Sequence, residues 1–474
     1  MQFTDTHPFL SLADVPLANE LVHLNRGRPY RKILKHLNSL YNPSARIEFE
    51  GSLWPFVRHL GRQSRSAGTE IRGEVIAPHF KALSGTLTYQ MPFGTPTAVT
   101  LGETTLRPST SLDFSNAFKG RRILVTGHTG FKGSWISAWL HKLGADVYGI
   151  SLAPSTDPNL FDACDLESKM TSMIVDTRHA DKLHAAISQI RPEIILHLAA
   201  QPLVRRSYAD PLETFDTNVM GSANLMQACM TIDGIKAIVC VTTDKVYLNN
   251  EWEWPYREND RLGGVDPYSA SKACVELIAY VYQHNLFKAD GRPRMATVRG
   301  GNVVGGGNWS ADRIVPDIVR AIVSGQPIEL RNPSAVRPWQ HVLELCEGYL
   351  EIGARLAADE AGIDDAWNFG PRAANEVTVE TLLRTTLDAW GKPDWPVKVH
   401  PSPLHEAELL RLDISKALAR LSWQPRLNID QTLRWTAEWY RAFYERTQHP
   451  WDLVSNQIDA FSELRALAAA QAAK

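Results

Sequence analysis

The stretch Lys119-Gly-Arg-Arg-Ile-Leu-Val-Thr-Gly-His-Thr-Gly-Phe-Lys-Gly133 decides the fold, because it joins an apolar strand to a glycine-rich turn and a helix. Arg122 to Thr126 predict the strand, and Ser134 to Leu143 carry an apolar stripe at helical spacing. Three glycines separate them at three-residue intervals: Gly127, Gly130 and Gly133. Such glycines permit a tight turn, close approach of backbone N–H groups to a pyrophosphate, and close helix–strand packing. The stretch therefore predicts a dinucleotide site at a helix N-terminus, with a plain structural turn as the alternative.

Strands alternate with helices from about Asn116 to Asn302. The strands expected are Ile123–Thr126, Asp146–Ser151, Glu193–Leu198, Ala237–Thr242 and Arg294–Arg299. This alternation predicts an α/β fold, a Rossmann-type doubly wound parallel sheet with helices on both faces. Ligands of such sheets lie beyond the carboxyl ends of the strands, which is where the polar motifs of this chain fall.

Composition narrows the class of protein. A chain of 474 residues is long enough for two or three domains, and its net charge of −2 argues against nucleic acid or an anionic membrane as partner. No apolar run reaches the ~20 residues of a membrane span, and no signal peptide is evident. Five scattered cysteines without a C-x-x-C pair predict reduced core thiols in a cytoplasmic protein and no metal site.

A second motif, Tyr268-Ser-Ala-Ser-Lys272, places a tyrosine and a lysine one helical turn apart on one helix face. A tyrosine titrates near ~10 in isolation, so it needs help to act as a base at neutral pH. We expect Lys272, together with an oxidised nicotinamide, to lower the pKa of Tyr268 by stabilising the phenolate. A Thr-rich strand end, Val241-Thr-Thr-Asp-Lys245, precedes this pair.

The order of glycine loop, threonine and Tyr/Lys pair resembles the extended short-chain dehydrogenase/reductase family. A closer resemblance, to the CDP-glucose 4,6-dehydratases, runs from about Asn116 to about Tyr444. The segments that carry it are Gly127–Trp135, Thr243–Tyr247, Tyr256–Asn259, Gly263–Gly264, Asp266–Ala273, Arg299–Val303, Gly306–Trp309 and Arg337–Val342. Thr-Asp-Lys in place of the Thr-Asp-Glu of dTDP-glucose enzymes, and the run Arg-Pro-Trp-Gln-His, favour the CDP branch.

The resemblance divides the chain into four expected regions. They are an N-terminal extension of unknown role (1–113), an NAD-binding Rossmann domain (114–302), a mixed α/β nucleotide-sugar-binding lobe (303–445) and a C-terminal helical tail (446–474). Within the extension, Gly85 to Leu106 reads as Thr-rich alternating strands.

The resemblance also implies the chemistry: transient oxidation of CDP-glucose at C4, loss of water across C5 and C6, and return of the hydride to C6, with NAD as cofactor. Tyr268 would take the C4 hydroxyl proton, with Thr243 hydrogen-bonding the same oxygen and Lys272 holding the cofactor ribose. Asp244 and Lys245 would serve as acid and base for the elimination. Lys245 must be neutral to act as a base and Asp244 must be protonated to act as an acid, so the two are expected to titrate as a coupled pair. An orienting role for Lys245 stays open.

Binding residues follow from the same resemblance. For NAD they are Gly127, Thr129, Gly130, Phe131, Lys132, Asp176, Thr177, Leu198, Ala199, Ala200, Asn218, Thr242, Tyr268 and Lys272. For the nucleotide sugar they are Gln201, Arg205, Asn302, Arg313, Arg331, Arg337 and Glu406, the arginines as forked donors to the diphosphate. One departure is that the second strand ends Gly149-Ile-Ser-Leu-Ala-Pro154, without the acid that NAD sites place on the ribose, which predicts looser NAD binding.

Two other functions remain. A nucleotide-sugar 4-epimerase, or another NAD-dependent sugar-nucleotide dehydratase, would share the Tyr/Lys pair, although an epimerase has no need of Asp244 and Lys245. A non-catalytic nucleotide-sugar-binding or scaffold protein is the alternative from a different class. The family implies a homodimer built from two helices of each subunit, about Pro211–Met230 and Pro267–Leu286. Their apolar stripes are Leu225, Ala228 and Cys229, and Val275, Ile278, Ala279 and Tyr282.

Overall fold

The computed structural model describes residues 113–289, 291–372, 375–399 and 410–472, together with seven short strands earlier in the chain. The chain divides into two compact units, Met1–Thr110 and Ser111–Lys474. In the first, β2 (Arg46–Glu50), β6 (Gly85–Gln90) and β7 (Thr97–Leu101) form an antiparallel sheet. The last two strands fall within the Thr-rich stretch that predicts strands.

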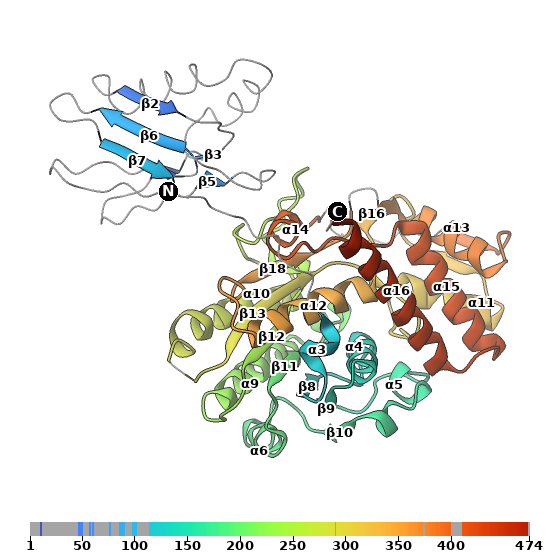
Figure 1. Cartoon of the computed structure of the whole chain (residues 1–474). Coiled ribbons are helices and arrows are strands. Elements are labelled where there is room, and N and C mark those ends of the chain that lie inside the picture. The colour runs from blue at the N-terminus through green and yellow to red at the C-terminus, as the bar shows by residue number, and fades with distance from the viewer. Residues whose placement is uncertain are drawn as a thin grey trace. The chain divides into compact units, whose positions relative to one another are not determined.

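A seven-stranded sheet organises the second unit, in the order β10-β9-β8-β11-β12-β13-β18, and every pairing is parallel (Figure 1). Its strands are β8 (Arg122–Thr126), β9 (Asp146–Ser151), β10 (Thr171–Ile174), β11 (Ile194–His197), β12 (Ala237–Val241), β13 (Arg294–Gly300) and β18 (Ala366–Phe369). The five strands predicted from the sequence differ from these by at most one residue at either end. The chain order reverses between β8 and β11, so the ligand crevice of a doubly wound sheet lies there. The predicted fold class is confirmed.

The two faces of the sheet bury alternate residues of the same strands. In β8, Ile123 and Val125 belong to one core cluster and Leu124 to the other. The first face is covered by α4 (Phe131–Lys142) and α12 (Val342–Ala357), and the second by α6 (Ala180–Ile190), α9 (Gly221–Cys229) and α10 (Pro267–Val281). Because both faces are buried, the strands read as continuous apolar runs rather than alternating ones.

The stretch assigned to the substrate lobe also contributes to the sheet. β18 pairs with β13. α12, which lies between these two strands in the sequence, packs against β11, β12 and β13. The rest of this stretch forms the helices α11 (Ile314–Ser324), α13 (Val379–Trp390), α14 (Ser415–Leu421) and α15 (Ile429–Glu445). It also forms three short strand pairs: β14 (Val303–Val304) with β17 (Gln340–His341), β15 (Ile328–Leu330) with β20 (Val397–Val399), and β16 (Val336–Pro338) with β19 (Glu376–Thr378). A boundary at residue 302 therefore does not separate the sheet from the lobe.

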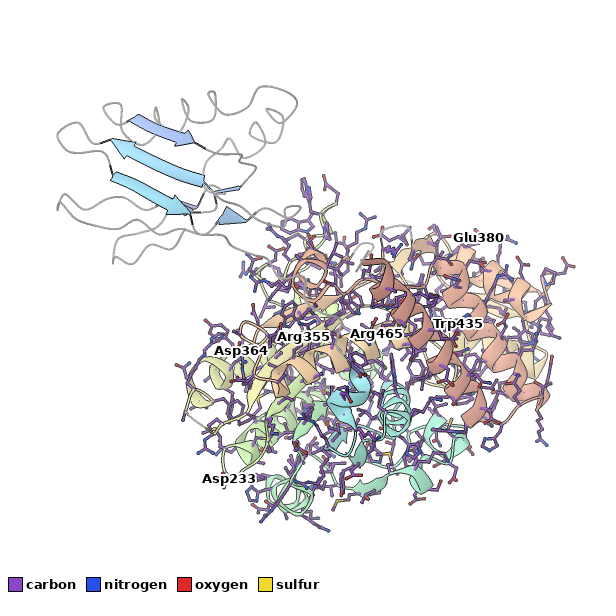
Figure 2. All side chains as sticks on the ribbon, viewed as in Figure 1. Asp233, Arg355, Asp364, Glu380, Trp435 and Arg465 are labelled. Carbon is purple, nitrogen blue, oxygen red and sulfur yellow. The ribbon has the colours of Figure 1, made fainter. Side chains whose placement is uncertain are left out.

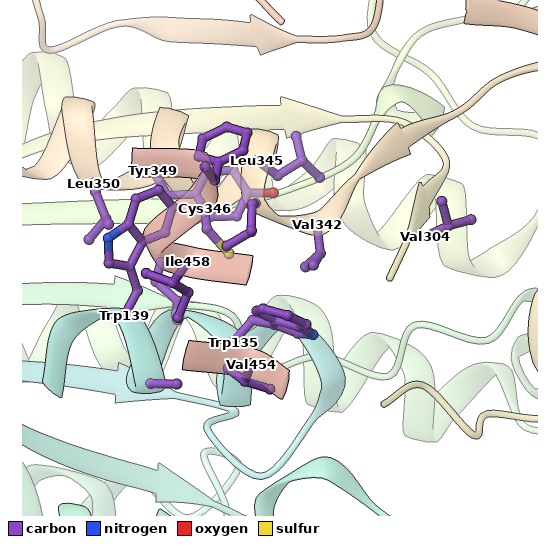
Figure 3. Packing of buried hydrophobic residues seen from close by; sticks show 14 of the residues in the cluster. Trp135, Trp139, Val304, Val342, Leu345, Cys346, Tyr349, Leu350, Val454 and Ile458 are labelled. Atoms are coloured by element: carbon purple, nitrogen blue, oxygen red, sulfur yellow. The ribbon is translucent and has the colours of Figure 1, made fainter. Parts of the chain in front are cut away.

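The C-terminal tail is the long helix α16 (Pro450–Ala472), which packs against the Rossmann core. Figure 3 shows Val454 and Ile458 of this helix beside Trp135 and Trp139 of α4. At its far end Arg465, labelled in Figure 2, pairs with buried carboxylates of α12. Among the described residues, no helix combines the length and the apolar character that a membrane crossing requires.

The two helical stretches expected to form a dimer interface turn their stripes inward. The first consists of α8 (Pro211–Phe215), the π-turn η3 (Asp216–Met220) and α9, and the second of α10 and η5 (Tyr282–Leu286). The residues of these stripes that lie in the core beside the sheet are Leu225, Ala228, Cys229, Val275, Ile278, Ala279 and Tyr282. The prediction that these residues face a partner is wrong, because in a doubly wound sheet the apolar stripe of each covering helix is buried against the sheet.

Candidate active site

The glycine loop packs against the end of β11 so closely that only glycine fits. Gly127 has a φ of +73°, and a Cβ there would lie 2.9 Å from the Ala199 nitrogen. A Cβ at Gly133 would lie 2.0 Å from the Gly127 carbonyl oxygen. Gly130 is the N-cap of α4 and provides no side-chain cap, so the first N–H groups of the helix lack a capping partner. This cradle of glycines and N–H donors fits a dinucleotide pyrophosphate.

Leu198, Ala199 and Ala200 follow β11, and the backbone of Leu198 and Ala199 lies against Gly127 of the loop. The Leu198 and Ala199 nitrogens each donate to the Thr126 hydroxyl at 3.2 Å. His197 accompanies them, with Nδ1 at 2.7 Å from the same hydroxyl, and burial lowers the pKa of His197 to about 3. The structure thus joins the ends of β8 and β11, as the predicted cofactor residues require.

The end of β9, where the sequence lacks the acid that NAD sites place on the ribose, is joined to the glycine loop. The Thr129 hydroxyl lies 2.8 Å from the Ser151 hydroxyl and donates to the Leu152 carbonyl at 2.9 Å, so it ties the glycine loop to this strand. His128 fits over Gly149, where a Cβ would come within 2.3 Å of its ring. Burial lowers the pKa of His128 to about 4, so its ring is neutral at pH 7.

Beyond β10 the predicted cofactor residues Asp176 and Thr177 are held by internal contacts. Arg178 binds the Asp176 carboxylate through Nε and Nη2, and this hydrogen bonding lowers the pKa of Asp176. Thr177 packs on the first residue of α9, where a Cβ on Gly221 would lie 2.6 Å from its hydroxyl. Neither contact reaches the glycine loop.

Asn218 links two parts of the site. Its side chain donates to the Gln201 carbonyl at 3.1 Å and to the Ser271 hydroxyl of α10 at 2.8 Å, and it accepts from the Gln201 nitrogen at 2.7 Å. The Gln201 amide itself bonds to Thr214 and to the Leu203 backbone. The polar atoms of the Gln201 side chain are therefore engaged inside the protein rather than directed to a ligand.

The acid/base segment begins at the end of β12. Thr243 caps the 3₁₀ turn η4 (Asp244–Val246), and its hydroxyl donates to the Asp244 carboxylate at 3.0 Å. Burial raises the pKa of Asp244, while the Lys245 cation opposes the rise, as does Lys132 from the glycine loop. Burial also lowers the pKa of Lys132 to about 8, with Lys272 acting in the same direction. The charges of two lysines, Lys245 and Lys132, thus act on one buried aspartic acid, and that of a third, Lys272, acts on Lys132.

Tyr268 and Lys272 lie on α10, whose N-cap Asp266 accepts from the Ser269 nitrogen at 2.9 Å. Burial raises the pKa of Tyr268, against the lowering effects of its hydrogen bond with Thr243 and of Arg313. Desolvation of the phenol outweighs these effects, so the pKa of Tyr268 lies above its ordinary value. Lys272 donates to the Val241 carbonyl at 3.0 Å, and burial lowers its own pKa.

Three of the predicted substrate arginines come together at the start of α11. Arg205 and Arg331 both donate to the Asp312 carboxylate, at 3.0 and 3.1 Å, and Arg313 donates to the Pro202 carbonyl at 3.0 Å. Asn302 lies between β13 and β14, and its carbonyl accepts from the Gln340 nitrogen. Arg337 lies on β16 (Val336–Pro338) and donates to the Val336 carbonyl. Glu406 lies outside the described residues.

Sequence reasoning missed a buried ion pair behind the site, between Glu276 of α10 and Arg299 of β13. The available signals were a glutamate one helical turn after Lys272 and an arginine inside an otherwise apolar strand. A charge in such a strand must be paired when it is buried.

Comparison with known proteins agrees with this geometry. Residues 124–436 match the protein family described as GDP-mannose 4,6 dehydratase. The chain is 45% identical to a CDP-glucose 4,6-dehydratase of Salmonella typhimurium over 333 residues, which cover 69% of this chain and 92% of that protein. It is 31% identical to a dTDP-glucose 4,6-dehydratase of Streptomyces antibioticus, over 56% of this chain and 74% of that protein. A Streptomyces venezuelae dTDP-glucose 4,6-dehydratase solved with NAD superposes with a TM-score of 0.58 at 25% identity, covering 69% of this chain and 98% of that one.

Proposed function

This chain belongs to the GDP-mannose 4,6 dehydratase family, and we propose that it is a CDP-glucose 4,6-dehydratase that uses NAD. The reaction converts CDP-D-glucose to CDP-4-keto-6-deoxy-D-glucose and one water. The observation that carries the proposal is the buried, hydrogen-bonded pair Thr243–Asp244 beside Tyr268, in a chain 45% identical to an enzyme of that name.

The chemistry requires oxidation before elimination, because the C5 proton of glucose is not acidic until C4 is a ketone. NAD, held by the glycine loop and Lys272, would supply the hydride acceptor for C4 and the hydride donor for C6. Tyr268 accepts the C4 hydroxyl proton, and Thr243, hydrogen-bonded to Tyr268, orients the same oxygen. Tyr268 must be a phenolate to accept this proton, and the charge of Lys272 stabilises that phenolate.

Asp244 favours a dehydratase over a 4-epimerase. An epimerase oxidises and reduces the same carbon, so it needs no second acid to expel a hydroxyl group. Burial raises the pKa of Asp244, which keeps its carboxyl protonated to higher pH and able to donate to the departing C6 hydroxyl. Lys245 adjoins it and is the candidate base at C5. Lys132, with a pKa of about 8, is a second amine close enough to Asp244 to change its pKa.

The substrate diphosphate is best accommodated where Arg205, Arg313 and Arg331 converge. Asp312 is the carboxylate that Arg205 and Arg331 share, so the cluster keeps an excess of positive charge. Arginine forks match phosphate geometry, and Arg313 also acts on Tyr268 through its charge. The cluster therefore connects the diphosphate position to the catalytic tyrosine.

We also propose a homodimer through the outer faces of α8, η3 and α10. Leu277 and Tyr280 of α10 are 59% and 61% exposed, and Val281, Leu212 and Met220 are exposed as well. These residues lie on the side of the helices that faces away from the sheet, and a patch of this kind marks an association surface. The five cysteines are free thiols, which favours a cytoplasmic location.

The test is to incubate the purified chain with CDP-glucose and separately with dTDP-glucose, with and without added NAD, and to follow product mass. Loss of one water from CDP-glucose alone is expected, with a gain on adding NAD because the site lacks the ribose-binding acid. Interconversion of the C4 epimers without loss of mass would show an epimerase, and an unchanged sugar at saturating NAD would refute the proposed activity.

A further inference from the structure

The catalytic loop from Thr243 to Val246 is held at both ends by one buried ion pair. Glu276 and Arg299, which form the pair, are 4% and 3% exposed, and the Arg299 Nη2 lies 2.8 Å from the Glu276 Oε2. Glu276 lies one helical turn beyond Lys272 on α10. Arg299 lies on β13, three residues before Asn302. The pair thus connects the helix that carries Tyr268 and Lys272 to the strand that leads to Asn302.

Glu276 holds the first end of the loop. Its carboxylate accepts from the Thr242 hydroxyl at 2.5 Å, and Thr242 directly precedes Thr243. It also accepts from the Thr297 hydroxyl at 2.8 Å and from Arg299 Nε at 2.9 Å. With the Nη2 contact these make four hydrogen bonds, so the capacity of a buried carboxylate is used in full. Lys272 reinforces the same place by donating to the Val241 carbonyl.

Arg299 holds the second end. Its Nη1 donates to the Tyr247 hydroxyl at 2.7 Å, and Tyr247 directly follows Val246. The same nitrogen donates to the Glu258 carbonyl at 2.9 Å, and the guanidinium lies over the Tyr247 ring, 5.0 Å from its centroid. Tyr247 in turn donates to Asn368 of β18 at 2.7 Å.

We propose that the Glu276–Arg299 pair is a positioning element that sets the distance between the acid/base residues Asp244 and Lys245 and the oxidation pair Tyr268 and Lys272. This inference rests on the proposed function, because it assigns the pair to the relative position of the residues that carry out two steps of that reaction. Neither Glu276 nor Arg299 touches the reacting atoms; both act through the loop.

The geometry gives the two steps different sensitivities to the pair. Tyr268 and Lys272 share one helix face, so the spacing needed for C4 oxidation is fixed within α10. Asp244 and Lys245 lie on a separate loop, and that loop is joined to α10 through the Thr242–Glu276 contact. A loosened loop therefore slows elimination more than oxidation. A reacting group displaced by about 1 Å loses on the order of 10²-fold in rate.

The main variant is Glu276→Gln, which keeps the shape of the side chain and removes its charge. Turnover of CDP-glucose should fall by about 10²-fold with little change in KM. The fraction of bound nicotinamide in the reduced form at steady state, read by its fluorescence, should rise, because oxidation continues while elimination is slow. Tyr247→Phe tests the other end of the loop with the ion pair intact. It should also lower turnover and raise the reduced fraction, but each by less than Glu276→Gln does.

The matched control is Glu351→Gln, which also removes a buried carboxylate from an arginine, here Arg355 on α12 (Figure 2). It should lower the melting temperature yet leave kcat per folded molecule and the reduced fraction at parental values. An unchanged reduced fraction in both Glu276→Gln and Tyr247→Phe, with kcat falling only as the folded fraction falls, would overturn the positioning role. If Glu276→Gln does not fold, Tyr247→Phe decides by the same two readouts. A parental protein that releases no water from CDP-glucose would instead overturn the proposed function, and the positioning role with it.

Discussion

Gly133→Ala tests whether the glycine loop is shaped for a cofactor. The added Cβ would lie 2.0 Å from the Gly127 carbonyl oxygen, where ordinary contact begins at 3.4 Å, so these atoms must separate by 3.4 − 2.0 = 1.4 Å. The other atoms that it meets, the Gly127 carbonyl carbon and the His128 Cα, are also backbone, so no change of rotamer relieves the clash. The loop must move, and overpacking of this kind costs about 1–3 kcal/mol.

The expected result is a loss of about 10²-fold in NAD affinity, because a shift of this size takes the loop N–H groups out of hydrogen-bond range of the pyrophosphate. The measurement is calorimetric titration of the purified variant with NAD, alongside its melting temperature. Gly391→Ala is the control, since Gly391 has a φ of +80° at the end of α13 and no atom lies within 4 Å of its added Cβ. That variant should lose stability through backbone strain and bind NAD normally. Parental NAD affinity in Gly133→Ala would refute the assignment of this loop to the cofactor.

Three further changes test the acid, the core and the dimer. Because burial raises the pKa of Asp244, kcat should fall as pH rises through that pKa, and Asp244→Asn should remove this limb of the pH profile along with most water loss. Burial and the nearby Glu347 raise the pKa of Glu344 from 4.5 to about 8, so its contribution to stability is present below about pH 4.5 and lost as pH rises through 8. Glu344→Gln should therefore gain up to about 5 kcal/mol over the parent in urea unfolding as the pH rises from 4.5 to above 8, and an identical pH dependence in both would contradict the shift. Leu277→Glu should convert the dimer to a monomer in light scattering, whereas a monomeric parental chain would disprove the interface.

The amino-acid sequence determined the features that depend on neighbouring residues. The strand–glycine–helix stretch from Arg122 and the apolar runs that follow predict the doubly wound sheet, because the spacing of apolar residues is a local property of the chain. The catalytic candidates were recognisable for the same reason. Thr243, Asp244 and Lys245 are consecutive, and Tyr268 and Lys272 are one helical turn apart, so each group is complete within a few residues.

Tertiary structure decided whatever depends on contacts between distant segments. The Asp312 carboxylate brings Arg205 and Arg331 together although more than a hundred residues separate them, and the Glu276–Arg299 pair joins a helix to a strand across the sheet. Burial is a property of the folded molecule alone, which is why the desolvation of Tyr268 and the inward orientation of the α10 apolar stripe could not be read from the sequence. Local periodicity shows which side of a helix is apolar, but only the packed sheet determines whether that side meets the core or a partner.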